Sequence, residues 1–334
     1  MNETAGESQA DDAGRLERLE SQIIGSALGG DPETTELALH LMHTKQFDQG
    51  EELLTQGEVG EEFLVVTEGT VIVEDESHSE IARLGPGSVL GEIALLHGSP
   101  ISATVRALSP VHVLFCGADE FEQILETGEL LDELEAVAET RLGSNWSRSV
   151  PSIPYTLRTG ALVDLRPLMQ ADEERLIRFD SQLSEHSRRL RFLTGTKLTA
   201  GLVRYLIEID QRRHIAWVAT DESGELVAIA RAIRLREEPE AAEFAIAVRD
   251  DWQGHGLGML LFGVLGSAAS ALGVRSFIAH ALWENTAMLA MLAHLDAEVA
   301  HEDPGVFISH SRLPHAPSEL EPLVQQIMAS RELQ

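Results

Sequence analysis

The stretch EFAIAVRDDWQGHGLGMLLFGVLGSAAS, which runs from Glu243 to Ser270, constrains the fold more than any other part of the chain. It has the pattern of a buried strand, a short glycine-rich turn and a long apolar helix. Glycines at such a turn let the backbone come close to an anion, and the unpaired N–H groups of the first helical turn point toward it. The sequence therefore predicts a site for a phosphate or pyrophosphate group.

A second motif follows in ALWENTAMLAMLAHL, where a strand leads through Asn285 into a short helix at 286–294. Asparagine is a common N-cap, and a capping role is compatible with a ligand contact. The spacing of Gln253, Gly256 and Gly258 resembles the Q/R-x-x-G-x-G/A pattern of GNAT acetyltransferases, and the longer βαβ repeat of a dinucleotide fold is absent. The resemblance covers most of residues 155–312 and implies a mixed α/β fold that binds acetyl-CoA through Ala247, Val248, Gln253, Gly254, His255, Gly256, Leu257, Gly258 and Asn285.

Glu243 is the candidate general base. In the GNAT family a substrate amine attacks the acetyl thioester directly, and a lysine amine, with a pKa of about 10.4, is unprotonated in only about one molecule in a thousand at neutral pH. Glu243 begins the strand EFAIAV, where apolar neighbours would raise the pKa of its carboxyl group. A solvated strand-end carboxylate is the alternative. The related protein acetyltransferases place their proposed base in a similar A-E-[apolar]-A-[apolar]-x-V strand, which favours the catalytic role.

The acid that protonates the departing thiolate is not evident. Many GNAT enzymes use a tyrosine, but Tyr155 and Tyr205 both precede the acetyl-CoA motifs. His255 belongs to the glycine turn, where its backbone matters more than its ring. His280 in FIAHAL is a core or a cleft histidine, and a core position is favoured. His310 lies on the last predicted strand. Either the thiolate leaves unassisted, or the acid comes from a position that the sequence does not reveal.

The N-terminal half has a different sequence pattern. Short alternating runs separated by glycines between Phe47 and Phe115 predict a small antiparallel barrel or sandwich. GEIALLHGSPISATV at 91–105, preceded by a glycine-spaced roll at 53–73, resembles the phosphate-binding cassette of cyclic-nucleotide-binding domains. The resemblance implies nucleotide contacts from Gly91, Glu92, Ile93, Ala94 and Ser102, and it makes cyclic AMP a possible allosteric ligand.

Ile101 occupies the cassette position at which that family has an arginine that pairs with the cyclic phosphate. A charge-assisted hydrogen bond contributes about 1.5–3 kcal/mol, so its loss weakens binding by roughly ten- to a hundredfold. Arg106, just past Val105, could point to either face of its strand. Cyclic-nucleotide binding is therefore in doubt, and the alternatives are a degenerate sensor or a docking module.

These patterns predict an α+β chain of two domains. A cyclic-nucleotide-binding-like β-roll with flanking helices is followed by a mixed α/β GNAT domain, an order that resembles the mycobacterial cyclic-AMP-regulated protein lysine acetyltransferases. Those enzymes acetylate acyl-CoA synthetases, and their C-terminal segment acts as a lid. We expect a disordered acidic segment at 1–13, the regulatory domain at 14–143, a linker at 144–154, the GNAT domain at 155–316 and a C-terminal helix, a possible lid, at 317–334.

Charge and composition restrict the partners. The chain has 55 acidic and 25 basic residues, a net charge of −30, which disfavours nucleic acid. High-GC coding bias or a saline cytoplasm is the favoured explanation of this charge, and attraction of a basic protein substrate is compatible with it. No signal sequence or membrane span is recognisable, and the single Cys116 argues against disulfides and zinc. We expect a cytoplasmic enzyme without a metal. A small-molecule amine acetyltransferase and a non-catalytic acetyl-CoA sensor remain the competing functions.

Overall fold

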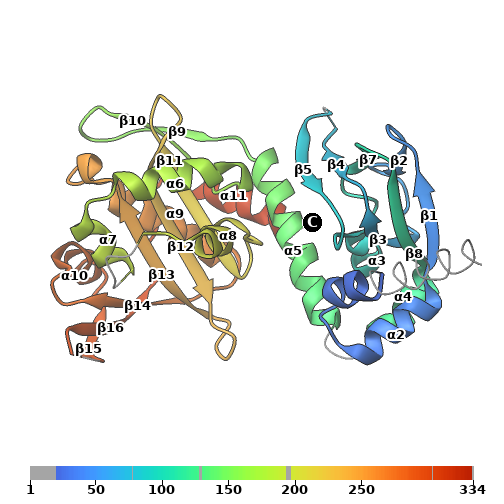
Figure 1. Cartoon of the computed structure of the whole chain (residues 1–334). Helices are drawn as coiled ribbons and strands as arrows, with labels where there is room; N and C mark the ends of the chain where they lie inside the picture. Colours follow the sequence, from blue (N-terminus) through green and yellow to red (C-terminus); the bar gives the residue numbers. More distant parts are fainter. Residues whose placement is uncertain (1–19, 77, 128–129, 193–196, 303, 333–334) are drawn as a thin grey trace, which may run out of the picture. The chain divides into compact units, whose positions relative to one another are not determined.

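The computed structural model describes residues 20–76, 78–127, 130–192, 197–302 and 304–332 (Figure 1). The chain divides into two compact units, Met1–Glu139 and Thr140–Gln334, and each is described by itself. The acidic segment 1–13 lies outside the described residues, so its predicted disorder stays a prediction. None of the helices in the described part combines the length and the apolar character that crossing a bilayer requires.

The N-terminal unit is the predicted β-roll with flanking helices. Its described strands form two four-stranded antiparallel sheets, ordered β1-β8-β3-β6 and β2-β7-β4-β5. Apolar side chains that alternate along the strands, such as Val66 and Val113, fill the space between the sheets. The elements are α2 (Pro32–Leu41), β1 (His43–Phe47), β2 (Glu52–Leu54), β3 (Glu62–Glu68), β4 (Val71–Glu74), β5 (Glu80–Leu84), β6 (Val89–Leu90), α3 (Glu92–His97), β7 (Thr104–Ala107), β8 (Val111–Gly117) and α4 (Ala118–Leu125).

The C-terminal unit is built on one eight-stranded sheet, ordered β15-β16-β14-β13-β12-β11-β10-β9. Within it, β13 and β14 pair in parallel, whereas their outer neighbours pair antiparallel. The elements are β9 (Ile153–Thr156), β10 (Leu162–Pro167), η1 (Gln170–Asp172), α6 (Glu173–Gln182), α7 (Glu185–Phe192), α8 (Ala200–Ile207), β11 (His214–Thr220), β12 (Leu226–Arg234), β13 (Ala241–Val248), η2 (Asp250–Trp252), α9 (Leu257–Ala271), β14 (Ser276–Leu282), α10 (Thr286–Ala293), β15 (Glu298–His301), β16 (Val306–Arg312) and α11 (Glu321–Glu332).

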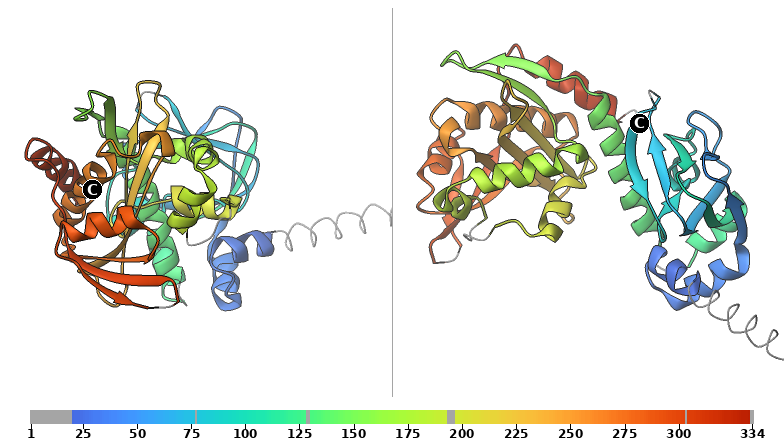
Figure 2. Two further views of the ribbon diagram at one scale, coloured as in Figure 1. Left: turned by 90° about the vertical axis from the view of Figure 1, so that its left-hand side faces the viewer. Right: turned by 45° about the horizontal axis from the view of Figure 1, so that its top comes forward.

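Helices cover both faces of this sheet (Figures 1 and 2). On one face, α9, α10 and α11 enclose the larger core, in which the rings of Phe244 and Phe262 stack 4.6 Å apart. On the other face, α6 and α8 pack against β11 and β12 around Phe179 and Leu206. The mixed α/β fold predicted for this half is confirmed.

One predicted element is corrected. The linker expected at 144–154 is wrong over 144–149, because α5 (Leu130–Ser149) continues to Ser149. Trp146 explains the difference: its ring is buried in the core of the C-terminal unit, and its indole N–H donates to Ser330 Oγ at 2.9 Å. Further along the chain, Leu183 and Ser184 leave the helical conformation and separate α6 from α7.

Candidate active site

The parallel strands β13 and β14 separate at Glu243. Their pairing runs only from Ala241 opposite Ser276 to Glu243 opposite Ile278, yet β13 continues to Val248 and β14 to Leu282. Backbone groups on the facing edges of the two strands beyond Glu243 are therefore not used in pairing β13 to β14. Their N–H groups can donate to the carbonyl oxygens of an extended ligand that enters between the strands, and their carbonyl oxygens can accept from its amide N–H groups.

Glu243 lies at this divergence, on the sheet face that carries α6 and α8. Phe244, its neighbour, points into the opposite core, and alternation places Glu243, Ala245 and Ala247 on the same side. The side chain of Glu243 is exposed, so the apolar enclosure expected from its sequence neighbours is wrong. Arg191, at the end of α7, is close enough for its charge to interact with the Glu243 carboxylate.

The glycine turn joins β13 to α9. Gly254 and Gly256 both adopt positive φ angles, +77° and +83°, and Gly256 is the N-cap of α9 without a side-chain cap. A Cβ atom at either position would meet nothing within 4 Å, so the backbone is open on that side. The first N–H groups of the 15-residue helix α9, at Leu257 and Gly258, are consequently available to an anion.

The turn is fastened to α7 by polar side chains that the sequence did not single out. Asp250 accepts hydrogen bonds from the N–H and Oγ of Ser184, at 2.9 and 2.7 Å, and from Ser187 Oγ at 2.8 Å. Gln253, one of the predicted acetyl-CoA contacts, donates from its amide to Ser187 Oγ and to Val248 O, both at 3.1 Å. The side chain of Gln253 therefore shapes the turn. The only sequence signal for these hydrogen bonds was the presence of serines at the start of a helix.

Asn285 and His255 have the local roles that their positions suggest. Asn285 caps α10, because its Oδ1 accepts from the N–H of Met288 at 3.0 Å. His255 packs its ring edge-on against Trp252, with centroids 6.3 Å apart. Neither contact excludes a ligand, and the acetyl-CoA contacts predicted for both residues stay predictions.

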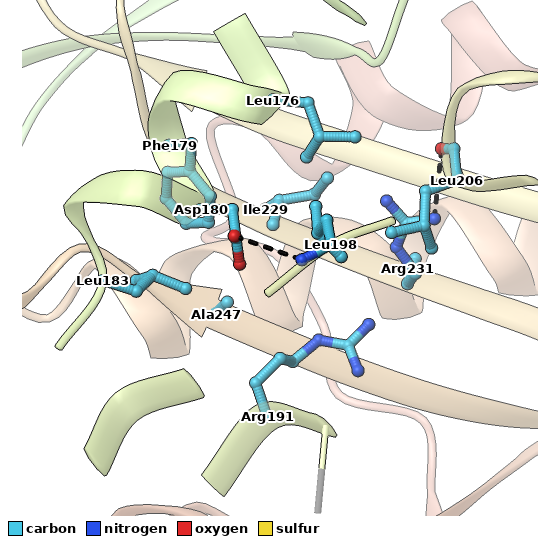
Figure 3. Close-up of a pocket in the computed structure, with 10 residues that line it drawn as sticks. All are labelled: Leu176, Phe179, Asp180, Leu183, Arg191, Leu198, Leu206, Ile229, Arg231 and Ala247. Atoms are coloured by element: carbon cyan, nitrogen blue, oxygen red, sulfur yellow. Dashed lines mark hydrogen bonds between the residues drawn. The ribbon is translucent and has the colours of Figure 1, made fainter. Parts of the chain in front are cut away.

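A small cavity lies on the sheet face covered by α6 and α8, the face to which strand alternation assigns Glu243. Figure 3 shows the residues that line it. Its volume is about 20 Å³, room for about one water molecule. Side chains from α6, α7, α8, β12 and β13 converge on it, and most are apolar. The lining residues are Leu176, Phe179, Asp180, Leu183, Arg191, Leu198, Leu206, Ile229, Arg231 and Ala247.

Two arginines bring positive charge to this cavity. Burial lowers the pKa of Arg231 to about 9, and the charge of Arg191 acts in the same direction. Arg231 donates to Leu206 O at 3.2 Å and lies 3.1 Å from His214 Nε2. Burial, with both arginines adding to it, lowers the pKa of His214 to about 3, so this ring is neutral. Sequence reasoning missed these residues; the signal was Arg231, which stands between two alanines in the apolar strand LVAIARAIRL.

His280 is not the core histidine that was expected. The α9 core takes Phe277, Ala279 and Ala281, so His280 points to the face of Glu243. Its side chain is 31% exposed, and its Nδ1 lies 2.6 Å from Glu302 Oε2. The reason is tertiary: the turn between β15 and β16 brings a carboxylate to a ring that the alternating sequence alone places in a core.

His310 and the tyrosines lie in other places. His310 is exposed on β16, opposite Ile278, one strand further from the divergence. Tyr155 is on β9, at the far edge of the sheet, and the ring of Tyr205 on α8 packs near that of His214 on β11. His280 lies on β14, one of the two strands that separate, whereas the sheet order puts Tyr155 at the opposite edge.

The C-terminal helix α11 packs against α9. Val324 and Met328 are fully buried there, on the face opposite Glu243. The predicted lid over the acceptor site is therefore not formed in this structure. Residues 318–320 form a turn, and α11 begins after it at Glu321.

The cassette of the N-terminal unit has the expected backbone conformation, but an isoleucine side chain packs where the family has an arginine. Gly91 adopts a φ of +84° and N-caps α3, with Glu92, Ile93 and Ala94 buried behind it and Ser102 half-buried. Ile101 is 6% exposed, and its Cδ1 comes within 2.8 Å of the position that a Cβ on Gly60 would take. The isoleucine therefore packs into the roll beside Gly60 instead of presenting a cation.

Arg106 does not replace the missing arginine. Val105 and Ala107 point into the roll, so Arg106 points outward. Its guanidinium donates to Glu52 Oε1 at 2.8 Å and to Glu74 Oε2 at 3.2 Å. Hydrogen bonding to these two carboxylates raises the pKa of Arg106, although partial burial opposes the shift.

Comparison with known proteins agrees with both halves. Residues 44–128 match the cyclic nucleotide-binding domain, and residues 163–298 match the acetyltransferase (GNAT) domain. The acetyltransferase Pat of Mycolicibacterium smegmatis is 34% identical over 271 residues, 80% of each chain. A solved cAMP-binding acyltransferase from Mycobacterium smegmatis is 28% identical, covering 91% of this chain and 92% of its own, with a TM-score of 0.48. The GNAT domain of S. lividans PAT is 27% identical, covering 48% of this chain and 97% of its own, with a TM-score of 0.46.

The two matched domains together span most of the described chain, and the 34% identity with Pat extends across both. The chain is thus an acetyl-CoA-dependent N-acetyltransferase of the GNAT type with a fused cyclic-nucleotide-binding domain, and it belongs to the Pat family of acetyltransferases.

Proposed function

We propose that, in the cytoplasm, the C-terminal domain transfers the acetyl group of acetyl-CoA to lysine side chains of proteins, with an acyl-CoA synthetase as the acceptor. The observation that carries the proposal is the position of Glu243. It is an exposed carboxylate at the point where β13 and β14 separate, on the strand that leads directly into the glycine turn of α9. One strand therefore joins a candidate base to a candidate phosphate site.

The exposure of Glu243 favours a protein acceptor. A lysine on a protein surface can reach only a base that is open to solvent, and Glu243 is open. Glu243 would take the proton of the lysine ammonium group, and the amine would then attack the thioester carbonyl. Backbone N–H groups on the unpaired edge of β13 would polarise that carbonyl. The net charge of −30 supports a basic partner by long-range attraction.

The acceptor class is tested with two kinds of substrate. The full-length protein is incubated with acetyl-CoA and a purified acyl-CoA synthetase, and lysine acetylation is read by mass spectrometry. We expect acetylation of a lysine in the synthetase. Rapid acetylation of spermidine or an amino sugar without transfer to protein would identify a small-molecule acetyltransferase. Binding of acetyl-CoA without transfer to any amine would identify a sensor.

The role of Glu243 is tested by Glu243→Gln, which keeps the size of the side chain and removes its basicity. General base catalysis contributes about 10²- to 10⁴-fold, so kcat should fall by at least about a hundredfold. The dissociation constant for acetyl-CoA should not change. Glu237→Gln, in the exposed loop before β13, is the matched control. A Glu243→Gln enzyme with wild-type kcat would place the base elsewhere.

We further propose that the N-terminal domain regulates this activity and that cyclic AMP is a weak ligand of it. The support is the cassette geometry: α3 and its glycine are in place, whereas Ile101 fills the position of the phosphate partner and Arg106 points away. Regulation requires two states of the enzyme that the ligand stabilises to different extents. Acetylation rates measured with and without cyclic AMP at concentrations that saturate the domain test this coupling.

A further inference from the structure

The transfer reaction leaves one proton without a carrier. After the amine attacks, its nitrogen bears a positive charge and an extra proton. An amide protonated on nitrogen is a strong acid, so the adduct gives a stable amide only when that proton is removed. The departing sulfur, in turn, needs a proton to become a thiol. Glu243 has already accepted the first proton, so a second group is required.

The pair His280–Glu302 has the geometry for this task. The ring Nδ1 of His280 and Glu302 Oε2 are 2.6 Å apart, and the two side chains are 31% and 37% exposed. With Nδ1 donating to the carboxylate, Nε2 is the nitrogen that remains to accept and release a proton. The carboxylate also fixes the orientation of the ring, as it does in other histidine–carboxylate pairs.

The supporting turn holds Glu302 in place. Its N–H donates to Val306 O at 3.3 Å. Trp283, three residues after His280 on the chain, donates its indole N–H to His301 Nδ1 at 3.1 Å, and its ring packs against Phe307. The strand that carries the histidine and the turn that carries the carboxylate are thus joined by contacts other than the pair itself.

The register places the pair on the correct side of Glu243. Ile278 is opposite Glu243, and His280 lies two residues further along β14, about 6.6 Å toward the end of the strands where α9 begins. The phosphates of acetyl-CoA belong at that end, so the sulfur lies between Glu243 and the glycine turn. His280 therefore faces the leaving group, whereas Glu243 faces the amine.

We propose that His280 is a second catalytic residue, a proton shuttle between the attacking nitrogen and the leaving sulfur, and that Glu302 is its positioning residue. The inference rests on the proposed transfer to an amine, whichever amine is used. The nitrogen lone pair forms the C–N bond. His280 Nε2 takes the extra proton from nitrogen, the C–S bond breaks with its electron pair on sulfur, and Nε2 delivers the proton to sulfur. The proton on Glu243 passes to solvent.

The test compares His280→Ala and His280→Gln with wild type, using the acceptor that the wild type acetylates best, lysine protein or spermidine. We expect kcat to fall by about a hundredfold in both variants and by about tenfold in Glu302→Gln, with acetyl-CoA affinity unchanged. His310→Ala, on the same face and one strand further away, is the matched control and should retain at least half of the wild-type kcat. Because the acceptor is chosen by activity, an error in the proposed acceptor class does not affect the result.

A second donor separates proton delivery from a structural role. The acetyl selenoester of CoA releases a selenolate, which is a weaker base than a thiolate and leaves without a proton. The deficit of the His280 variants should shrink with this donor, because only the removal of the nitrogen proton then depends on His280. A deficit of the same size with both donors would overturn the proposal. So would a His280→Gln enzyme with wild-type kcat on acetyl-CoA.

Discussion

The two domains each contain a glycine that opens a helix N-terminus, and the two sites differ in the space beside them. Gly91 and Gly256 have nearly the same backbone angle, with φ of +84° and +83°, and neither helix has a side-chain cap. A Cβ on Gly256 would meet nothing within 4 Å, whereas one on Gly91 would collide with the carbonyl of Glu62. Ile101 also packs into the cassette of Gly91.

The comparison teaches that backbone geometry alone does not define an anion site. Helix N–H groups contribute to binding only when space remains for the ligand and no apolar group must be displaced or desolvated beside the charge. The turn before α9 meets that condition. The cassette before α3 retains the backbone arrangement and has replaced the cation by Ile101. The same local motif can therefore offer an anion an open site in one domain and a weaker site in the other.

Ile101→Arg should produce the largest change in the difference between the two glycine sites, a gain in affinity for cyclic AMP. Restoring a charged partner for the phosphate contributes about 1.5–3 kcal/mol, which is about ten- to a hundredfold in the dissociation constant for cyclic AMP. Isothermal titration calorimetry of the full-length variant and the wild type measures it. Ile101→Gln is the control, because it removes the apolar group without adding charge.

The same titration can contradict the argument. If the wild type already binds cyclic AMP as tightly as Ile101→Arg, the arginine is dispensable and another group neutralises the phosphate. If Ile101→Gln gains as much affinity as Ile101→Arg, the apolar packing of the isoleucine is the obstacle rather than the missing charge.

The sequence revealed those parts of the fold that depend on neighbours along the chain. The glycine turn, the strand before it and the cap at Asn285 are local patterns, and the structure places them as expected. The prediction of a linker was wrong because the structure of that stretch depends on residues far away in the sequence. Serines in SNWSRS favour a loop, but Trp146 is buried among residues far away in the sequence, and that burial extends α5 through the stretch.

The residues of the candidate site divide in the same way: local sequence patterns reveal some of them, and only tertiary contacts bring the others together. Glu243 and Ile101 were found because each lies at a fixed place in a motif. Arg231 and His214 meet only because β11 pairs with β12, and Glu302 reaches His280 only through the turn before β16. No periodicity along the chain records such contacts, so the charged cavity and the histidine–carboxylate pair required the structure.

Gly256→Ala should have the second-largest effect, a loss of acetyl-CoA affinity at the glycine turn before α9. A residue with a Cβ loses about 1–2 kcal/mol in the left-handed conformation, so the free turn should relax, and acetyl-CoA should bind about five- to thirtyfold more weakly. Calorimetry with acetyl-CoA measures the change. Gly160→Ala is the matched control, because Gly160 also has a positive φ of +89° with nothing within 4 Å but lies in the turn between β9 and β10. Equal loss in both variants would show a general change in the domain.

Arg106→Ala should have the smallest effect. Arg106 pairs with Glu52 and Glu74 on the outside of the roll and is 31% exposed, so the pairs should contribute less than about 1 kcal/mol to the free energy of unfolding. Because the guanidinium points away from the cassette, the affinity for cyclic AMP should change by less than twofold. Arg83→Ala, which removes the exposed pair with Glu80 on β5, is the control for stability. A tenfold loss of cyclic AMP binding in Arg106→Ala alone would mean that this arginine turns inward when the nucleotide binds. Arg106 would then supply the charge that Ile101 lacks.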